Sequence, residues 1–300
     1  MVTTQALRAQ HVVPTAVPHA FAHRRTPVRW TAGGRVGAAI LAFLILTALL
    51  GPLLVDADPD RQSLRDRLLP PIAFGGGWAH SFGTDQLGRD LLARLVNGAR
   101  TSLAIGIVAT LIAGVIGVSL GLVAGYLGGP ADRIVTFLAD AQLAMPFVIV
   151  AIGVVAVLGN STRNVVLVLA ITGWVAYTRV VRLQAAALRS APFVEVARAL
   201  GATRWRVMGR HILPNVAGPV IVIASQQIAA MILYEAALSY LGLGVSSGTI
   251  TWGGMLADGR ETLLTAWWIS AIPGIAIAIA ILGTNLFGDW LQNVIARRAR

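Results

Sequence analysis

The sequence predicts an all-α integral membrane protein with six transmembrane helices. Hydrophobic residues make up 56% of its 300 residues and charged residues only 12%, and the mean hydropathy is +0.73, a balance typical of membrane proteins. Apolar stretches long enough to cross a bilayer recur along the chain. No cysteine is present, so disulfides and thiol chemistry are excluded.

The chain begins with a polar segment, residues 1–35, that we expect to be a disordered cytoplasmic tail. Its histidines, His11, His19 and His23, lack the packed setting of a metal site, and no metal site is predicted. The first apolar stretch, 36–55, is too long for the core of a signal peptide. We therefore expect an uncleaved first transmembrane helix.

Residues 56–102 are expected to form an external segment, because several prolines and a run of three glycines favour irregular structure there. In the motif FGTDQLGRD that follows them, Thr84 or Asp85 is a candidate N-cap. The helix to be capped covers 91–103, where apolar residues recur at helical spacing. Such a helix would lie along the outer membrane surface before the next span.

The remaining apolar stretches predict transmembrane helices at 103–126, 134–158, 165–181, 216–241 and 266–291. In the first of these, Gly117, Gly121 and Gly125 recur every four residues, which puts them on one face for close helix packing. General enrichment of glycine in membrane helices is the alternative explanation. A polar external loop is expected at 242–265, and 296–300 forms a basic cytoplasmic tail.

An arginine-rich hydrophilic segment lies between the fourth and fifth spans at residues 189–215, hereafter the basic loop. A short helix is expected around Glu195, and Gly201 stands where a left-handed residue would end it. Thr203 can N-cap a second helix. Pro214 is expected to stop that helix, because the residue before a proline disfavours the α conformation. On charge alone, an ordinary basic loop is an equally good interpretation.

The arginines indicate how the chain is oriented. They gather in the N-terminal tail, in the basic loop and at the C-terminus. The positive-inside rule places these segments, and therefore both termini, in the cytoplasm. The same distribution explains the net charge of +11 better than a nucleic-acid-binding face does, so no nucleic-acid partner is predicted.

All 24 basic residues are arginine. A phosphate-binding loop of the form GxxxxGK[ST] needs a lysine, so this chain cannot carry one, and any ATP hydrolysis must belong to a partner. The sequence also lacks the GxSxG, HExxH and EF-hand patterns. An intramembrane enzyme is therefore not supported, and no catalytic residue is proposed.

Two acids near span ends have structural explanations. Asp132 is expected to pair with the adjacent Arg133 or to cap the third span. Asp289 is expected to reach the cytoplasmic interface from the end of the sixth span. Neither position requires a role in transport.

Two acids deeper in spans are candidates for a substrate path, because a carboxylate within a membrane is functional by default. Asp140 lies before Pro146, where a kink frees carbonyl groups, and a structural role is favoured over transport. Glu235 has two equally good interpretations. It can line a path for a cationic substrate, or it can pair with Arg94 or Arg100.

Several motifs occur in a fixed order: FGTDQLGRD, DAQLAMP, the basic loop, EAALSYLGLG and WGGMLADGR. The basic loop resembles the EAA loop of ABC-importer permeases, with Glu195 as the acid and Gly201 as the glycine. Val196 replaces the first alanine of that pattern, and His211 its hydrophobic residue. Over residues 36–295 the chain resembles the second permease subunit of bacterial peptide/nickel ABC importers.

The resemblance implies the type I ABC importer permease fold and a set of partners. These are a related permease that completes a heterodimer, two cytoplasmic ATPase subunits or one fused ATPase, an extracytoplasmic solute-binding protein, and membrane lipid. ATP and Mg would bind to the ATPases, and no cofactor to this chain. The resemblance also implies a location in the bacterial cytoplasmic membrane.

The resemblance implies two sets of site residues. ATPase coupling is assigned to Glu195, Ala197, Ala199, Leu200, Gly201, Arg204, Leu213 and Pro214. An external gate or binding-protein contact is assigned to Gly83, Thr84, Asp85, Gly88, Arg89, Asp90, Trp252 and Asp258. A possible substrate path at Glu235 and Asp140 rests instead on the position of these carboxylates within spans.

The predicted function is transport of di- or oligopeptides across the cytoplasmic membrane, driven by ATP hydrolysis on partner subunits. Nickel or another small solute is the alternative cargo. A proton-coupled secondary transporter using Asp140 or Glu235 is the alternative from another class, and it would need no EAA-type loop. A membrane-anchored regulator that binds DNA rests on arginine content alone and is disfavoured by six spans.

Overall fold

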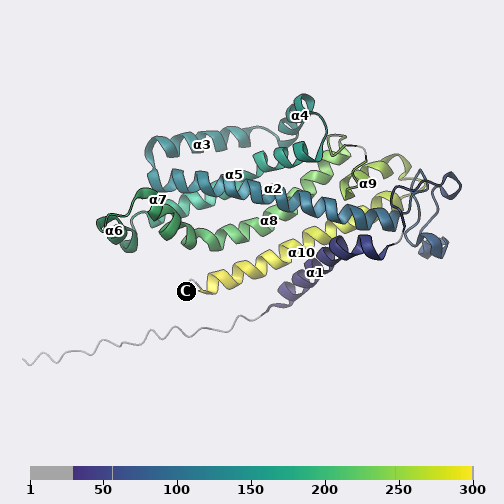
Figure 1. Ribbon diagram of the computed structural model, residues 1–300, viewed down its shortest axis with the longest axis horizontal. Helices are drawn as coiled ribbons and strands as arrows, with labels where there is room; N and C mark the ends of the chain where they lie inside the picture. Colours follow the sequence, from purple (N-terminus) through teal and green to yellow (C-terminus); the bar gives the residue numbers. More distant parts are fainter. Residues whose placement is uncertain (1–29, 56, 247, 299–300) are drawn as a thin grey trace, which may run out of the picture.

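The computed structural model describes residues 30–55, 57–246 and 248–298. Most of the tail expected at 1–35, and the last two residues of the basic tail expected at 296–300, lie outside this part. The described chain is a bundle of long helices that run roughly along one axis, with loops at both ends (Figure 1).

Within the described residues, five helices are long and apolar enough to cross a membrane. They are α1 (Ala32–Leu54), α2 (Leu91–Leu127), α5 (Thr162–Leu188), α8 (Leu213–Tyr240) and α10 (Trp268–Arg298). The bent pair α3 (Gly129–Ala144) and α4 (Phe147–Leu158) supplies the sixth span when it is counted as one. The predicted six-helix architecture is confirmed.

The third span is not the single helix expected at 134–158, because α3 and α4 meet at an angle of 91°. Pro146 explains the break. It lacks the N–H that would continue the helix, and it holds Met145 in an extended conformation with φ −95° and ψ 125°.

The helix expected at 91–103 does not lie separately on the membrane surface but forms the first part of α2. No proline or left-handed residue interrupts α2, so its 37 residues make a rod of about 55 Å, longer than the hydrocarbon core of about 30 Å. The N-cap is Asp90, whose carboxylate accepts from the Ala93 N–H at 2.8 Å. The expectation that Thr84 or Asp85 caps this helix was wrong, since both bind the loop before it.

The α2 and α5 helices are in close contact along a row of glycines, and the packing prediction is confirmed. A Cβ atom added at Gly117, Gly121 or Gly125 would lie 2.3, 2.9 or 2.3 Å from a backbone carbonyl oxygen of α5. Thr178 on α5 donates a hydrogen bond to the Gly117 carbonyl at 3.0 Å. Only glycine permits this approach of two helix backbones.

The α1 helix packs along α10, as Figure 1 shows, and α10 also contacts α8. A Cβ on Gly37 of α1 would lie 2.9 Å from the Gly283 carbonyl oxygen of α10. The outer face of α1 carries exposed Leu46, Leu49 and Leu53. Such a face suits contact with lipid.

The bundle places two hydrophilic regions at opposite ends (Figure 1): the loop between α1 and α2, and the basic loop with α6 (Pro192–Ala199) and α7 (Arg204–Val207). We predict that the basic loop faces the cytoplasm. In sealed cells an impermeant thiol reagent should label Gln62→Cys and leave Ser190→Cys unlabelled until the membrane is opened. Both side chains are exposed, and the reverse pattern would overturn the orientation.

Candidate functional site

The basic loop has the helix–turn–helix form expected from its sequence. Gly201 ends α6 in the left-handed conformation with φ +83°, and the Ala202 N–H returns to the Ala197 carbonyl at 3.0 Å. The Thr203 hydroxyl accepts from the Arg206 N–H at 3.4 Å and caps α7. The predictions for Gly201 and Thr203 are confirmed.

The prediction that Pro214 stops the second helix was wrong. The chain stays helical from Arg204 to Tyr240, because α7 leads into a π-helical turn (Met208–Ile212, η4) and then into α8. Pro214 lies in the first turn of α8, where a missing N–H is tolerated next to the wider turn. The basic loop is therefore joined to the fifth span by a continuous helical rod.

The α6 helix has a buried face and an exposed face. Val194 and Ala197, three residues apart and on the same side, are 0% and 9% exposed. The opposite side carries Val196 and Leu200, which are 58% and 83% exposed. Ala197 was assigned to ATPase coupling together with Leu200, but it points toward the bundle, whereas Leu200 points outward.

The remaining predicted coupling residues lie along the surface of the basic loop. Glu195, Ala199 and Arg204 are exposed, and so are Leu213 and Pro214 at its junction with α8. The structure therefore presents one apolar helix face with charged residues beside it. Such a combination, an apolar centre with a polar rim, is typical of protein contact surfaces.

At the other end of the bundle, Thr84 fastens the loop between α1 and α2. Its hydroxyl accepts from the Leu69 N–H at 2.9 Å and donates to the Asp66 carbonyl. Its carbonyl accepts from the Trp268 indole at 3.3 Å, at the start of α10. Thr84 is fully buried, so it holds the loop in shape from within.

Gly83 and Gly88 are required by the same loop. Their φ angles are +80° and +70°. A Cβ atom would lie 2.4 Å from the Leu69 carbonyl oxygen at Gly83, and 1.8 Å from that of Ser63 at Gly88. Both the backbone conformation and the space exclude a larger residue.

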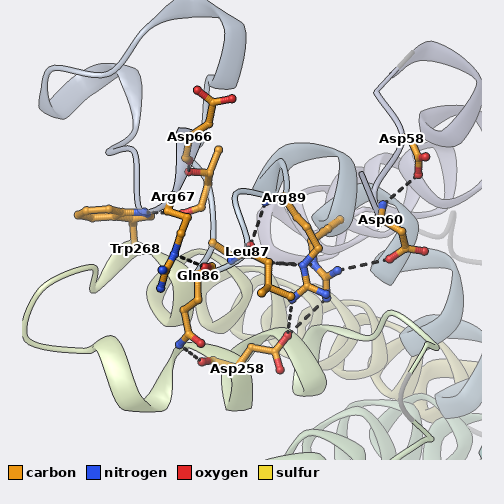
Figure 2. A network of polar contacts seen from close by, with 12 residues as sticks. Asp58, Asp60, Asp66, Arg67, Gln86, Leu87, Arg89, Asp258 and Trp268 are labelled. Atoms are coloured by element: carbon orange, nitrogen blue, oxygen red, sulfur yellow. Dashed lines mark hydrogen bonds and ion pairs between the residues drawn. The ribbon is translucent and has the colours of Figure 1, made fainter. Parts of the chain in front are cut away.

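A group of charged residues, hereafter the ion cluster, connects this loop to α9 (Trp252–Asp258) (Figure 2). It consists of Asp60, Asp85, Arg89, Arg94 and Asp258. Asp85 is 2% exposed and accepts from Nε of Arg89 at 2.6 Å. Arg94 is 6% exposed and reaches Asp60 at 3.5 Å and Asp258 at 3.4 Å. Gln86 adds a hydrogen bond to the Asp258 carbonyl at 2.7 Å.

Two other residues assigned to this end lie outside the ion cluster. Asp90 caps α2 and contacts Nδ1 of His80 at 2.8 Å. Trp252 is 2% exposed and donates from its indole to the Leu95 carbonyl at 2.9 Å. Both join α2 to neighbouring segments, and neither presents a free surface to a partner.

Glu235 is buried between α8 and α9. It is 1% exposed and accepts from the Ser239 hydroxyl at 2.8 Å. Arg94 belongs to the ion cluster, and no ion pair joins Glu235 to Arg94 or Arg100 within the described chain. The expected pairing of Glu235 with an arginine is therefore wrong, and its role in a substrate path stays a prediction.

Two ion pairs join α3 to α5. Asp132 accepts from Nη2 of Arg182 at 2.8 Å, not from the adjacent Arg133, because neighbouring residues on a helix point in different directions. Asp140 accepts from Nη2 of Arg179 at 3.0 Å. These pairs attach the first half of the broken span to the fourth span.

The family models identify the architecture. Residues 117–300 match the model described as a binding-protein-dependent transport system inner membrane component. Residues 33–71 match the N-terminal transmembrane domain of oligopeptide transport permease C. The chain belongs to this permease family. It is thus a multi-pass protein of the bacterial cytoplasmic membrane, and a proton-coupled secondary transporter is not favoured.

Curated relatives resemble the permease over most of its length. The probable D,D-dipeptide transport permease DdpC of Escherichia coli is 40% identical over 87% of this chain and 86% of its own. The di/tripeptide transport permease DppC of Pseudomonas aeruginosa is 38% identical over 92% and 89%. The MetNI methionine ABC transporter, solved in inward-facing conformations, shares the fold, with a TM-score of 0.53 at 19% identity over 67% of this chain.

Arg94 is the residue of the permease that sequence reasoning missed, since it was considered only as a partner for Glu235. Its three carboxylate partners come from 60, 85 and 258, which are far apart in the sequence. The one local signal was its position on the first turn of an amphipathic helix, where a buried arginine needs acids nearby.

We predict that Asp85→Asn destabilises the permease. The change leaves the guanidiniums of Arg89 and Arg94 without their most buried partner, a loss of about 3–5 kcal/mol for a buried pair. The midpoint of thermal unfolding in detergent should fall by several degrees. Asp58→Asn is the matched control, because Asp58 lies on the same loop and is exposed. Equal midpoints for both variants would show that the ion cluster contributes nothing to stability.

Proposed function

We propose that this chain is the permease subunit of an ABC importer that moves di- or oligopeptides across the cytoplasmic membrane. The observation that carries the proposal is 37–40% identity over most of the chain to proteins named as peptide, dipeptide or di/tripeptide permeases. ATP and Mg bind to partner ATPases, because a chain without lysine has no phosphate-binding loop of its own.

The basic loop is the contact with the ATPases. Its exposed Val196 and Leu200 enter a groove on the ATPase, and Glu195, Arg198 and Arg204 form the polar rim. Val194 and Ala197 hold α6 against the bundle. Because α7 continues into α8 without a break, a displacement of α6 is transmitted to the fifth span as the motion of a lever.

The opposite end faces the solute-binding protein. The ion cluster, Thr84 and the two glycines hold the loop after α1 in a fixed shape against α9, so a binding protein meets a rigid surface. A second, related permease completes the pore as a heterodimer, and membrane lipid covers the apolar outer faces. Two ATPase subunits, or one fused ATPase, complete the complex.

The function is tested with the complete complex in proteoliposomes. We expect ATP-dependent accumulation of a labelled dipeptide in the presence of the binding protein, and no phosphate release by this chain alone. A complex that accumulates Ni²⁺ but no dipeptide would overturn the cargo. Phosphate release by the isolated permease above that of a mock preparation would contradict the assignment of ATP hydrolysis to the partner subunits.

Gly201→Val should uncouple the ATPases. The φ of +83° is strained for a β-branched residue by roughly 1–3 kcal/mol, and relief of the strain tilts α6. Co-purification of the ATPases and dipeptide uptake should both fall, with normal pairing to the second permease.

Gly209→Val is the matched control for this prediction. Neither glycine has an atom within 4 Å of an added Cβ, but only Gly201 has a positive φ. Full ATPase binding and uptake by Gly201→Val would reduce the basic loop to an ordinary connection between spans.

A further inference from the structure

A cavity of about 240 Å³ lies between α3 and α5. It is lined by Val135, Thr136, Ala139, Asp140, Thr178, Arg179, Arg182 and Leu183. Aliphatic groups and the stems of the arginines supply most of its wall. The Asp140–Arg179 pair also belongs to the wall, and its side chains are 59% and 57% exposed.

The depth of this pair restricts what can surround it. Asp140 lies eleven residues after the start of α3, or about 16 Å along the helix axis. The hydrocarbon core of a bilayer is about 30 Å thick, so this position lies well inside the membrane. Charged groups at such depth are costly against lipid. The outer faces of α1 and α10 carry exposed leucines and isoleucines instead, such as Leu49 and Ile275. The face with Asp140 and Arg179 is therefore turned to water or to protein.

Further polar contacts join α3 to α5 on either side of this pair. Toward the start of α3, Asp132 binds Arg182. Toward Pro146, the Gln142 side chain donates to the Thr172 carbonyl at 3.1 Å and accepts from the Trp174 indole at 2.6 Å. Asp140, Arg179 and the cavity beside them, hereafter the polar seam, provide the charged and accessible lining that an aqueous path requires.

We propose that the polar seam binds the peptide in transit: Asp140 takes its ammonium group, Arg179 takes its carboxylate, and the cavity takes an apolar side chain. This inference rests on the peptide cargo proposed above. A free dipeptide carries one charge of each sign, roughly 6–7 Å apart. Arg179 and Asp140 offer the complementary charges from facing helices.

The Asp140–Arg179 pair is suited to exchange its partners. An exposed ion pair is only weakly held, because water screens it, so peptide termini replace it at little cost. Arg182 is not free to do the same, since two of its nitrogens bind Asp132. A permanent contact with the second permease would bury both charges, which is unfavourable without further partners, and would have to fill the cavity.

Charge reversal separates a cargo contact from a structural pair. The double variant Asp140→Arg with Arg179→Asp rebuilds the ion pair but moves each charge to the other helix. In proteoliposomes holding the complete complex, we expect dipeptide uptake to fall about tenfold or more. The ammonium group of the peptide would then face an arginine at 140 and its carboxylate an aspartate at 179, so both contacts become repulsive. Co-purification of the second permease and basal ATPase activity should stay normal. Arg133→Asp is the control, because Arg133 is exposed on the same helix and does not line the cavity; it should retain uptake.

Three results would overturn the proposal. Wild-type uptake by the reversed Asp140–Arg179 variant would make the pair structural. Loss of the second permease from that variant would make the polar seam a subunit interface. Wild-type uptake by the neutral variant Asp140→Asn with Arg179→Gln, the milder change if reversal prevents folding, would remove the charge requirement. Absence of dipeptide uptake by the wild-type complex would instead refute the peptide cargo itself.

Thiol labelling tests the aqueous exposure of the seam independently. The chain has no cysteine, and Leu183 is 65% exposed at the cavity wall. In the complete complex, Leu183→Cys should react with a charged methanethiosulfonate and be protected by dipeptide during turnover. Leu282→Cys, at an exposed position on α10, should stay unreactive against lipid. An unreactive Leu183→Cys would contradict a water-filled path.

Discussion

The close approach of α2 and α5 is the constraint on which the rest of the bundle depends. Three glycines at intervals of four bring one backbone onto the other, with added Cβ atoms only 2.3–2.9 Å from carbonyl oxygens. In a membrane, apolar contact with lipid competes with contact between helices, so such fitted backbones supply much of the specificity of packing. Because α5 lies fixed on α2, it can hold α3 through the ion pair between Arg182 and Asp132.

Two continuous rods then connect the ends of the molecule. The α2 helix reaches from the ion cluster to the glycine row, and the helix from Arg204 to Tyr240 reaches from the basic loop to the buried Glu235 beside α9. Displacements at either end of the bundle thus act on the same two packed elements. Rigid rods transmit displacement well because packed cores do not deform gradually.

Local chemistry made much of the architecture predictable. The number of spans, the left-handed Gly201, the Thr203 cap and the glycine row all follow from interactions within a few residues or from composition. What could not be predicted depends on contacts between distant segments. Arg94 has partners at 60, 85 and 258, and Asp132 prefers Arg182 to its neighbour because only the folded bundle sets their directions. The prediction that Pro214 ends a helix was wrong because the rule for prolines in α-helices does not anticipate a π-helical turn.

The wide turn at Met208–Ile212 also sets a rotational phase. Each residue of an α-helix advances its side chains by about 100°, so the one additional residue per turn decides which side of the basic loop faces outward relative to the fifth span. With an ordinary α-helical turn at this place, a different side of the basic loop would face outward. With the basic loop as the ATPase contact proposed above, the match between this permease and its ATPases depends on helix register as well as on surface chemistry.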